Sequence, residues 1–226
     1  MCTVSKRSPI LLLAVSVLAA LAMTLAPAAV GAADQIPKAS LPVLNVSAGQ
    51  GNGVLVVNAL ADRAKIPYDY SDVATAKHIA GGVGLPTFVE GEGAHKEIKS
   101  TAKPGTPYKT VILVMGASLK GMGASGLSIN SEISRLKDLV KYCKDNKILV
   151  VGMHVEGVSM RGKPGSDNEA IIDAVAPLCD YLIITEKGYN YDDKFAKIGS
   201  SKGIPISVAK NNTELQTIMK AMFGLN

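Results

Sequence analysis

From residue 41 onward, short apolar runs alternate with longer amphipathic ones. Three of the apolar runs are continuous, namely "TVILVMG" (110–116), "ILVVGMHV" (148–155) and "YLIITE" (181–186). A continuous apolar run of this length is typical of a strand buried on both faces of a sheet. Because runs of helical length separate these strands, the pattern predicts βαβ units and a parallel sheet.

The same alternation predicts six strands and five longer helices. The expected strands are 41–47, 66–70, 110–116, 148–155, 181–186 and 204–210. The expected helices are 54–65, 128–146, 166–179, 191–203 and 211–224. Ser166 with Glu169, and Asn211 with Glu214, have the spacing of a capping box at two helix starts.

The strands that carry proline and polar residues are expected at the edges of the sheet. These are 66–70 and 204–210, which contain Pro67 and Pro205. The order that places both outside is flavodoxin-like, with 66–70 beside 41–47, followed by 110–116 and the later strands. We therefore expect an α/β fold of three layers with a mostly parallel five- or six-stranded sheet of flavodoxin-like or Rossmann-like topology.

An irregular stretch, 71–109, interrupts the alternation between the second and third strands. It is longer than an ordinary connection and contains "GGVGLP" and "KPGTP". A short helix around 74–79 and a small hairpin around 87–89 are expected within it. Two interpretations stay open for this insertion, a mobile surface segment and a lid over a site.

The N-terminal 33 residues have the layout of a secretory signal peptide. Lys6 and Arg7 precede a nearly unbroken apolar run, 10–26, and small residues follow. Cleavage is expected after Ala32 or Ala33, which leaves a single α/β domain over 33–226 in the periplasm or outside the cell. The alternative is an uncleaved membrane anchor.

Composition limits the classes of partner. The formal net charge is +5, of which Lys6 and Arg7 contribute two charges, and the chain has no Trp. This balance is too mild to indicate a nucleic acid, and no membrane partner is expected after signal cleavage. Cys143 and Cys179 leave two alternatives: small core residues, or a disulfide in an exported protein.

Two glycine-rich loops predict the location of a site. "SAGQGNG" (47–53) follows the first strand, and "GASLKGMGASG" (116–126) follows the strand 110–116. Both flank the point where the expected strand order reverses, where α/β sheets open a crevice. The expected ligand-binding residues of the loops are Ser47, Gly49, Gln50, Gly51, Asn52, Gly53, Gly116, Ser118, Lys120 and Gly121.

Glycine-rich loops that lead into helix N-termini suit an anion. They expose backbone N–H groups, the helix dipole favours negative charge, and Lys120 would add a full charge. The alternative is simple turn chemistry. "GQGNG" lacks the G-x-G-x-x-G spacing of dinucleotide sites, and "GASLKGMG" lacks the G-K-[ST] of a P-loop. No cofactor is therefore expected.

A third loop offers candidate catalytic groups. His154 and Glu156 are two residues apart at a strand end, so we expect both to point to the same face of the sheet. Arg161 follows, and Glu186 ends the next strand. His154, Glu156 and Glu186 are candidates for acid–base chemistry, and His154, Glu156 and Arg161 for ligand binding. The alternative is an ordinary polar rim, and we assign no metal.

Four segments together resemble an uncharacterised family of exported bacterial α/β proteins. They are "GQGNGVLVVNALADRA", "TVILVMGASLKGMGASGLSI", "VGMHVEG" and "DYLIITEKGYNYDDKF", and the resemblance extends over most of 41–210. The resemblance implies export, a single α/β domain and attention to the two glycine-rich loops. It implies no catalytic residue.

The function expected from the sequence is binding of a small, anionic molecule at the carboxyl ends of the strands. One alternative is a periplasmic hydrolase that uses His154 and Glu156. Another is a protein-interaction module whose loops contact a partner chain. The oligomeric state stays open.

Overall fold

A computed structural model describes residues 1–2, 36–88 and 94–225 of the chain. The predicted signal peptide lies almost entirely outside the described residues. The described chain builds a seven-stranded sheet with the order β3-β2-β1-β4-β5-β6-β7. Its strands are β1 (Val43–Ala48), β2 (Tyr68–Ser71), β3 (Lys96–Ile98), β4 (Thr110–Met115), β5 (Leu149–His154), β6 (Tyr181–Thr185) and β7 (Ile206–Ala209).

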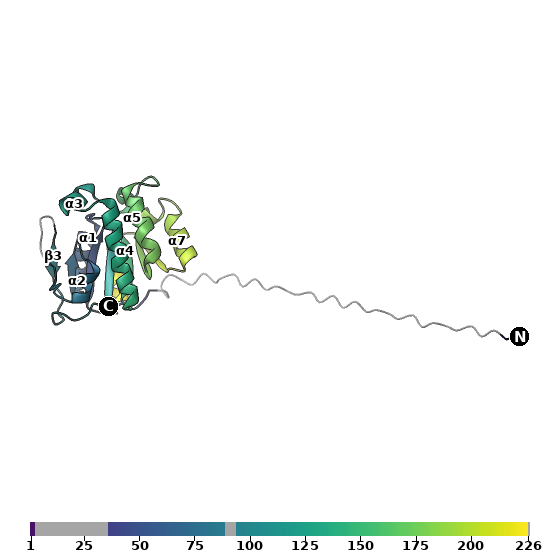
Figure 1. Cartoon of the computed structure of the whole chain (residues 1–226), viewed down its shortest axis with the longest axis horizontal. Coiled ribbons are helices and arrows are strands. Elements are labelled where there is room, and N and C mark those ends of the chain that lie inside the picture. The colour runs from purple at the N-terminus through teal and green to yellow at the C-terminus, as the bar shows by residue number, and fades with distance from the viewer. Residues whose placement is uncertain (3–35, 89–93, 226) are drawn as a thin grey trace.

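Helices cover both faces of the sheet, which gives three layers (Figure 1). The α-helices are α1 (Gly53–Ala64), α2 (Ala76–Gly81), α3 (Leu119–Ala124), α4 (Ile129–Asp145), α5 (Asp167–Val175), α6 (Glu186–Tyr189), α7 (Lys194–Lys202) and α8 (Asn212–Met222). Two short 3₁₀ turns are η2 (Gly157–Met160) and η3 (Ala176–Leu178). α1 and α8 pack on one face, and α2, α4, α5 and α7 pack on the other.

The predicted centre of the sheet is confirmed. β4, β5 and β6 are adjacent and parallel, with Thr110 opposite Leu149 and Val151 opposite Tyr181. Side chains of these strands are buried on both faces because helices cover both. The predicted neighbours of β1, which are β2 and β4, are also confirmed.

Two expectations for the sheet were wrong. It has seven strands rather than five or six, and β2 does not lie at its edge. β3, from the insertion 71–109, pairs antiparallel with β2 and covers it. The pattern missed β3 because it is three residues long and half exposed. Thr87 and Phe88 belong to no strand, so the expected hairpin does not form there; Val89 lies outside the described residues.

A buried aspartate anchors this insertion to the sheet. The carboxylate of Asp69 in β2 accepts hydrogen bonds from the Gly84 N–H (2.8 Å), the Ser100 N–H (3.0 Å) and the Tyr108 hydroxyl (2.6 Å). All three donors belong to the insertion, and Asp69 is fully buried. The described part of the insertion is therefore bonded to the fold at several points.

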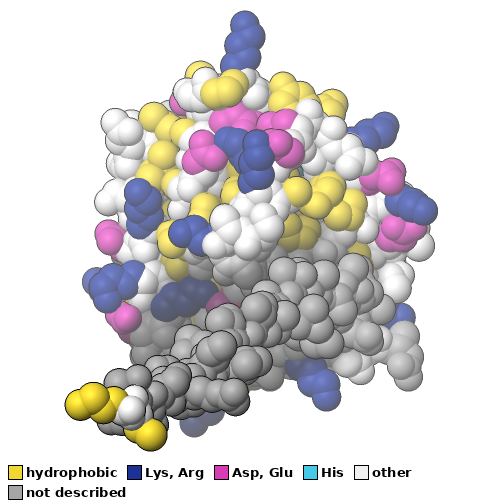
Figure 2. Space-filling view, turned by 90° about the vertical axis from the view of Figure 1, so that its right-hand side faces the viewer, with side chains coloured by type: hydrophobic (Ala, Val, Ile, Leu, Met, Phe, Trp, Pro, Cys, Tyr) yellow, Lys and Arg dark blue, Asp and Glu magenta, His cyan; other side chains and the backbone are white. Residues whose placement is uncertain are grey.

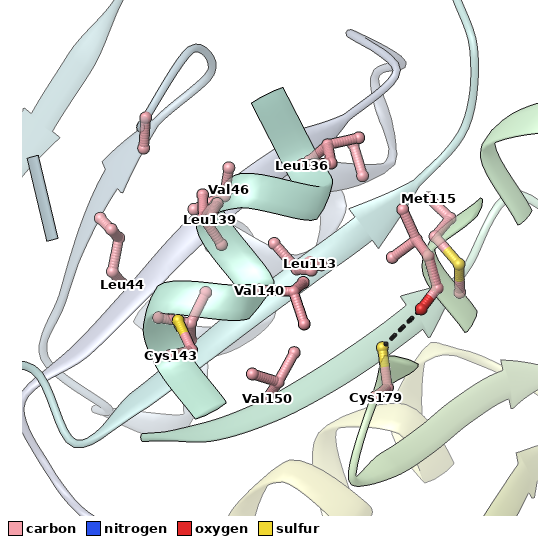
Figure 3. Packing of buried hydrophobic residues seen from close by; sticks show 14 of the residues in the cluster. Leu44, Val46, Leu113, Met115, Leu136, Leu139, Val140, Cys143, Val150 and Cys179 are labelled. Carbon is pink, nitrogen blue, oxygen red and sulfur yellow. Dashed lines mark hydrogen bonds between the residues drawn. The ribbon is translucent and has the colours of Figure 1, made fainter. Parts of the chain in front are cut away.

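Cys143 and Cys179 are free thiols in the core. Cys143 lies on α4, and Cys179 follows η3, where its Sγ lies 3.4 Å from the Val175 carbonyl oxygen. Figure 3 shows them apart, with Val150 between them in the view. Burial raises the pKa of each thiol to about 12, so neither is a reactive thiolate at neutral pH.

One of the two expected capping boxes forms differently. Asn211 caps α8 by accepting the Glu214 N–H at 3.0 Å, as expected. Ser166 makes no side-chain cap on α5, and the Glu169 side chain hydrogen bonds with Arg161 and the Gly162 N–H instead of reaching back to Ser166.

Charges of both signs are interspersed on the side of the molecule shown in Figure 2, wherever grey atoms do not cover it. No basic field of one sign appears in this view. In the described residues, no helix has the length and apolar content needed to cross a membrane.

Candidate functional site

The two glycine-rich loops are bonded to each other by their backbones. The Gly51 N–H donates to the Gly116 carbonyl at 2.8 Å, and the Gly116 N–H donates to the Ala48 carbonyl at 2.9 Å. The Ser118 N–H donates to the Gly49 carbonyl at 2.7 Å. A Cβ atom added at Gly51 would lie 2.6 Å from the Gly116 oxygen. Close approach of the two loops is therefore one physical reason for these glycines.

Substituting Gly51 should expose this constraint. Gly51→Ala should lower the free energy of unfolding by about 1–3 kcal/mol, because the new methyl group meets backbone and not a movable side chain. Gly123→Ala on α3 is the matched control, since nothing lies within 4 Å of its Cβ position. The control should be neutral or stabilising by up to about 1 kcal/mol. Equal urea midpoints for the two variants would contradict this interpretation.

Carboxylates of the protein already bind two of the loop amides. Glu132 on α4 accepts the Gly49 N–H at 2.8 Å, and Arg135 holds Glu132 at 2.7 Å. Glu156 accepts the Gly53 N–H at the start of α1, also at 2.8 Å. The positive end of α1 thus faces an internal carboxylate. Burial raises the pKa of Glu156, and the hydrogen bond from Gly53 partly offsets this.

A pocket of about 250 Å³ lies beside the loops, at the carboxyl ends of β1 and β2. Its lining residues are Ser47, Gln50, Gly51, Asn52, Val54, Leu55, Tyr70, Asp72, His95, Gly121, Ala124 and Ser125. Five of them, Ser47, Gln50, Gly51, Asn52 and Gly121, were predicted from the sequence. Both glycine-rich loops therefore contribute to one hollow at the point where the strand order reverses.

Seven lining residues were not predicted, and three of these, Tyr70, Asp72 and His95, come from β2 and the insertion. Tyr70 and Asp72 lie at the end of β2, and His95 precedes β3. The Asp72 carboxylate accepts the His95 N–H at 2.9 Å, while Gln50 donates its amide to the Asp72 carbonyl at 2.6 Å. The sequence did contain one signal for Tyr70 and Asp72. Because β1 and β2 are parallel neighbours, their carboxyl ends lie at the same edge of the sheet.

Burial is the largest influence on the pKa values of Asp72 and Tyr70. It raises the pKa of Asp72, which is 6% exposed, and hydrogen bonding and the charge of His95 partly offset the rise. Burial also raises the pKa of Tyr70, with further contributions from the negative charges of Asp72 and Glu97. Tyr70 is therefore a neutral hydroxyl in a negative environment.

The remaining loop residues of the prediction have structural contacts. The N–H groups of Gly49 and Gly53 donate to the carboxylates of Glu132 and Glu156, and the Gly116 carbonyl accepts the Gly51 N–H. The Ser118 hydroxyl caps α3 by accepting the Gly121 N–H at 3.1 Å. Lys120, in the first turn of α3, is exposed and is not among the pocket residues.

His154 and Glu156 do not share a face, contrary to expectation. β5 ends at His154, so the alternation of the strand does not reach Glu156. His154 is fully buried against Phe195 on the α4 face, with Nε2 3.1 Å from the Met160 carbonyl. Glu156 instead reaches Gly53 on the α1 face. Burial lowers the pKa of His154, so its imidazole is neutral.

Arg161 and Glu186 also lie apart from the pocket. The Arg161 guanidinium is fully buried; it pairs with Glu169 at 2.8 Å and Asp192 at 2.8 Å and lies over the Phe195 ring. Glu186 is the exposed first residue of α6. In the described part of the chain, no group of three or more His, Cys, Asp or Glu side chains is arranged to hold a metal ion.

Comparison with known proteins gives a family but no activity. Residues 40–223 match the model of a family described as a domain of unknown function (DUF6305). The resemblance to an uncharacterised family is thereby confirmed, while export and bacterial origin stay predictions. A search of curated proteins found no match.

Proposed function

We propose a function from the structure, because the chain belongs to this family and the family has no known activity. The protein binds a small molecule in the pocket beside β1 and β2. The supporting observation is the convergence of both glycine-rich loops, the end of β2 and the insertion on one hollow. We further propose that this binding is non-catalytic and takes place after export to the periplasm or the exterior.

The topology supports this location. In flavodoxin-like and Rossmann-like sheets, ligands bind where the strand order reverses, at the carboxyl ends of the strands. The chain reverses between β2-β1 and β1-β4, and the pocket lies at that end. A volume of about 250 Å³ is below the range of sites for drug-sized ligands, which favours a small metabolite.

The predicted anionic character of the ligand stays a prediction, and two features weigh against it. Lys120 is exposed and outside the pocket lining, and Glu156 accepts an amide that an anion would use. The hydrolase alternative requires His154 and Glu156 to face one substrate. Because the two side chains lie on opposite faces of the sheet, we favour binding over hydrolysis.

Two exposed leucines provide a matched test. Leu55 is 56% exposed and lines the pocket, whereas Leu119 is 72% exposed and does not. The retained ligand is first identified by native mass spectrometry of gently purified protein. Leu55→Trp should then weaken its binding by about tenfold or more, because the larger ring fills the pocket mouth. Leu119→Trp should leave the affinity within about twofold.

Two outcomes would contradict the proposal. One is the absence of any retained molecule together with the absence of binding in a fragment screen by NMR. The other is a ligand whose affinity is equal in the parent and in Leu55→Trp. Because both leucines are on the surface, loss of folding is not expected to confuse the comparison.

A further inference from the structure

We propose that the ligand of this pocket is a small organic cation, whose ammonium group is held by Asp72 against the ring of Tyr70. This inference rests on the proposed function and adds the chemical class of the ligand. It starts from an imbalance of charge at the site.

Asp72 is a buried carboxylate that forms no ion pair with a described lysine or arginine. The other buried carboxylates on α4 and α5 are paired: Glu132 with Arg135 at 2.7 Å, and Glu169 with Arg161 at 2.8 Å. Asp72 is 6% exposed, yet no described lysine or arginine lies within 4.0 Å of it. A buried charge is costly unless it is paired.

Asp69 shows why Asp72 differs. Asp69 also lacks a basic partner, but three donors of the insertion saturate it and it does not line the pocket. Among the described residues, the His95 N–H is the one donor to the Asp72 carboxylate from another part of the chain. Of these two buried aspartates, Asp72 is the one placed to meet a ligand.

The rest of the pocket wall suits a positive charge. Tyr70 pairs with Glu97 across β2 and β3, and both Glu97 and Asp72 act electrostatically on its ring hydroxyl. An aromatic face attracts ammonium groups, most strongly where water is excluded. The pocket lining contains no lysine or arginine among the described residues, so no basic side chain there would repel a cation.

The lining suits an organic cation better than a metal ion. Asp72 is the only acidic residue among the described lining residues, and calcium or magnesium sites need several oxygen ligands. Val54, Leu55 and Ala124 provide apolar surface for the carbon skeleton of a ligand. The bond from His95 to Asp72 is made by the backbone N–H, so His95→Ala should leave cation binding unchanged.

The test uses three probes of equal chain length that differ in charge: n-butylammonium, n-butanol and butyrate. Calcium chloride is the fourth probe, and binding is followed by amide shifts in two-dimensional NMR. n-Butylammonium should saturate the shifts of Asn52, Asp72 and Gly121. Asp72→Asn should weaken its binding by about tenfold or more. Asp145→Asn, on an exposed carboxylate at the end of α4, should not change it.

Two rim variants keep the test valid if Asp72→Asn does not fold. Leu55→Lys should weaken binding of n-butylammonium and Leu55→Glu should strengthen it, each by about two- to fivefold. Both changes are made at an exposed position on the pocket. Equal affinities in these two variants would overturn the assignment of charge.

The probes separate failure of this inference from failure of the proposed function. Preferential binding of n-butanol or butyrate at the pocket amides would overturn the cationic class and leave the binding function in place. Shifts caused by calcium and not by n-butylammonium would overturn the organic class. If none of the four probes shifts the pocket amides, the inference is wrong, and the proposed function is wrong as well when no molecule is retained and the fragment screen finds no binding.

Discussion

Arg161→Met should lower the free energy of unfolding by about 3–5 kcal/mol, the scale for breaking a buried ion pair. The guanidinium is fully buried and pairs with Glu169 and Asp192, each at 2.8 Å. It also donates to the Gly188 carbonyl at 2.7 Å. Methionine restores volume but leaves the Glu169 carboxylate buried with Lys194 as its remaining basic partner. Urea unfolding near neutral pH measures the loss.

The same variant should show a distinct pH dependence. Burial alone would raise the pKa of Glu169, but hydrogen bonds from Arg161 and Lys194 outweigh burial and hold it at about 2, below the ordinary 4.5. A lowered pKa stabilises the fold above the unfolded value, and this stabilisation disappears as the pH falls toward 2. The difference in stability between the parent and Arg161→Met should therefore shrink below about pH 4.5.

Lys197→Met is the control for this experiment. Lys197 also forms an ion pair, with Asp193, but its side chain is 73% exposed. Exposed pairs contribute little, so the control should unfold at the parent's urea concentration. Equal destabilisation by Arg161→Met and Lys197→Met would show that the buried pair contributes no more than an exposed one.

Asp69→Ala should also destabilise the protein by about 3–5 kcal/mol and loosen the insertion. The change leaves the Gly84 and Ser100 N–H groups and the Tyr108 hydroxyl without their acceptor in a buried site. Each orphaned donor costs about 1–3 kcal/mol. Amide hydrogen exchange should accelerate at Gly84 and Ser100 beyond the change expected from global stability alone.

Asp62→Ala on α1 is the matched surface control for Asp69→Ala. Asp62 also accepts hydrogen bonds from the insertion, through Lys99 at 2.8 Å, but its side chain is 48% exposed. Its loss should cost about 1 kcal/mol or less. Protection of Gly84 and Ser100 that is unchanged in Asp69→Ala would mean that the insertion is held by other contacts.

Part of the candidate site was visible in the sequence. Glycine-rich loops at the carboxyl ends of two central strands indicated where backbones approach, and Gln50, Gly51 and Gly121 do line the pocket. Asp72 and His95 escaped prediction, because the insertion that brings them together has no hydrophobic period of its own. One of its anchors on β2 is Asp69, whose role cannot be read from its neighbours in the chain.

The placement of His154 and Glu156 shows a second limit of prediction from the sequence. A strand that ended one or two residues later would have placed both side chains on one side of the sheet. The sequence pattern locates strand ends only to within a few residues. Here, the end of β5 at His154 separates a neutral core histidine from a carboxylate that binds the start of α1.

The sequence by itself determined the layered architecture and the order of its central strands, because apolar periodicity is a local signal of burial. The tertiary structure alone decided which groups meet the loop amides. Glu132 accepts a hydrogen bond from the Gly49 N–H, 83 residues away in the chain, and Glu156 accepts one from the Gly53 N–H, 103 residues away. No local pattern encodes such pairs, since they form only when the packed helices and strands bring a carboxylate within hydrogen-bonding distance of a free N–H group.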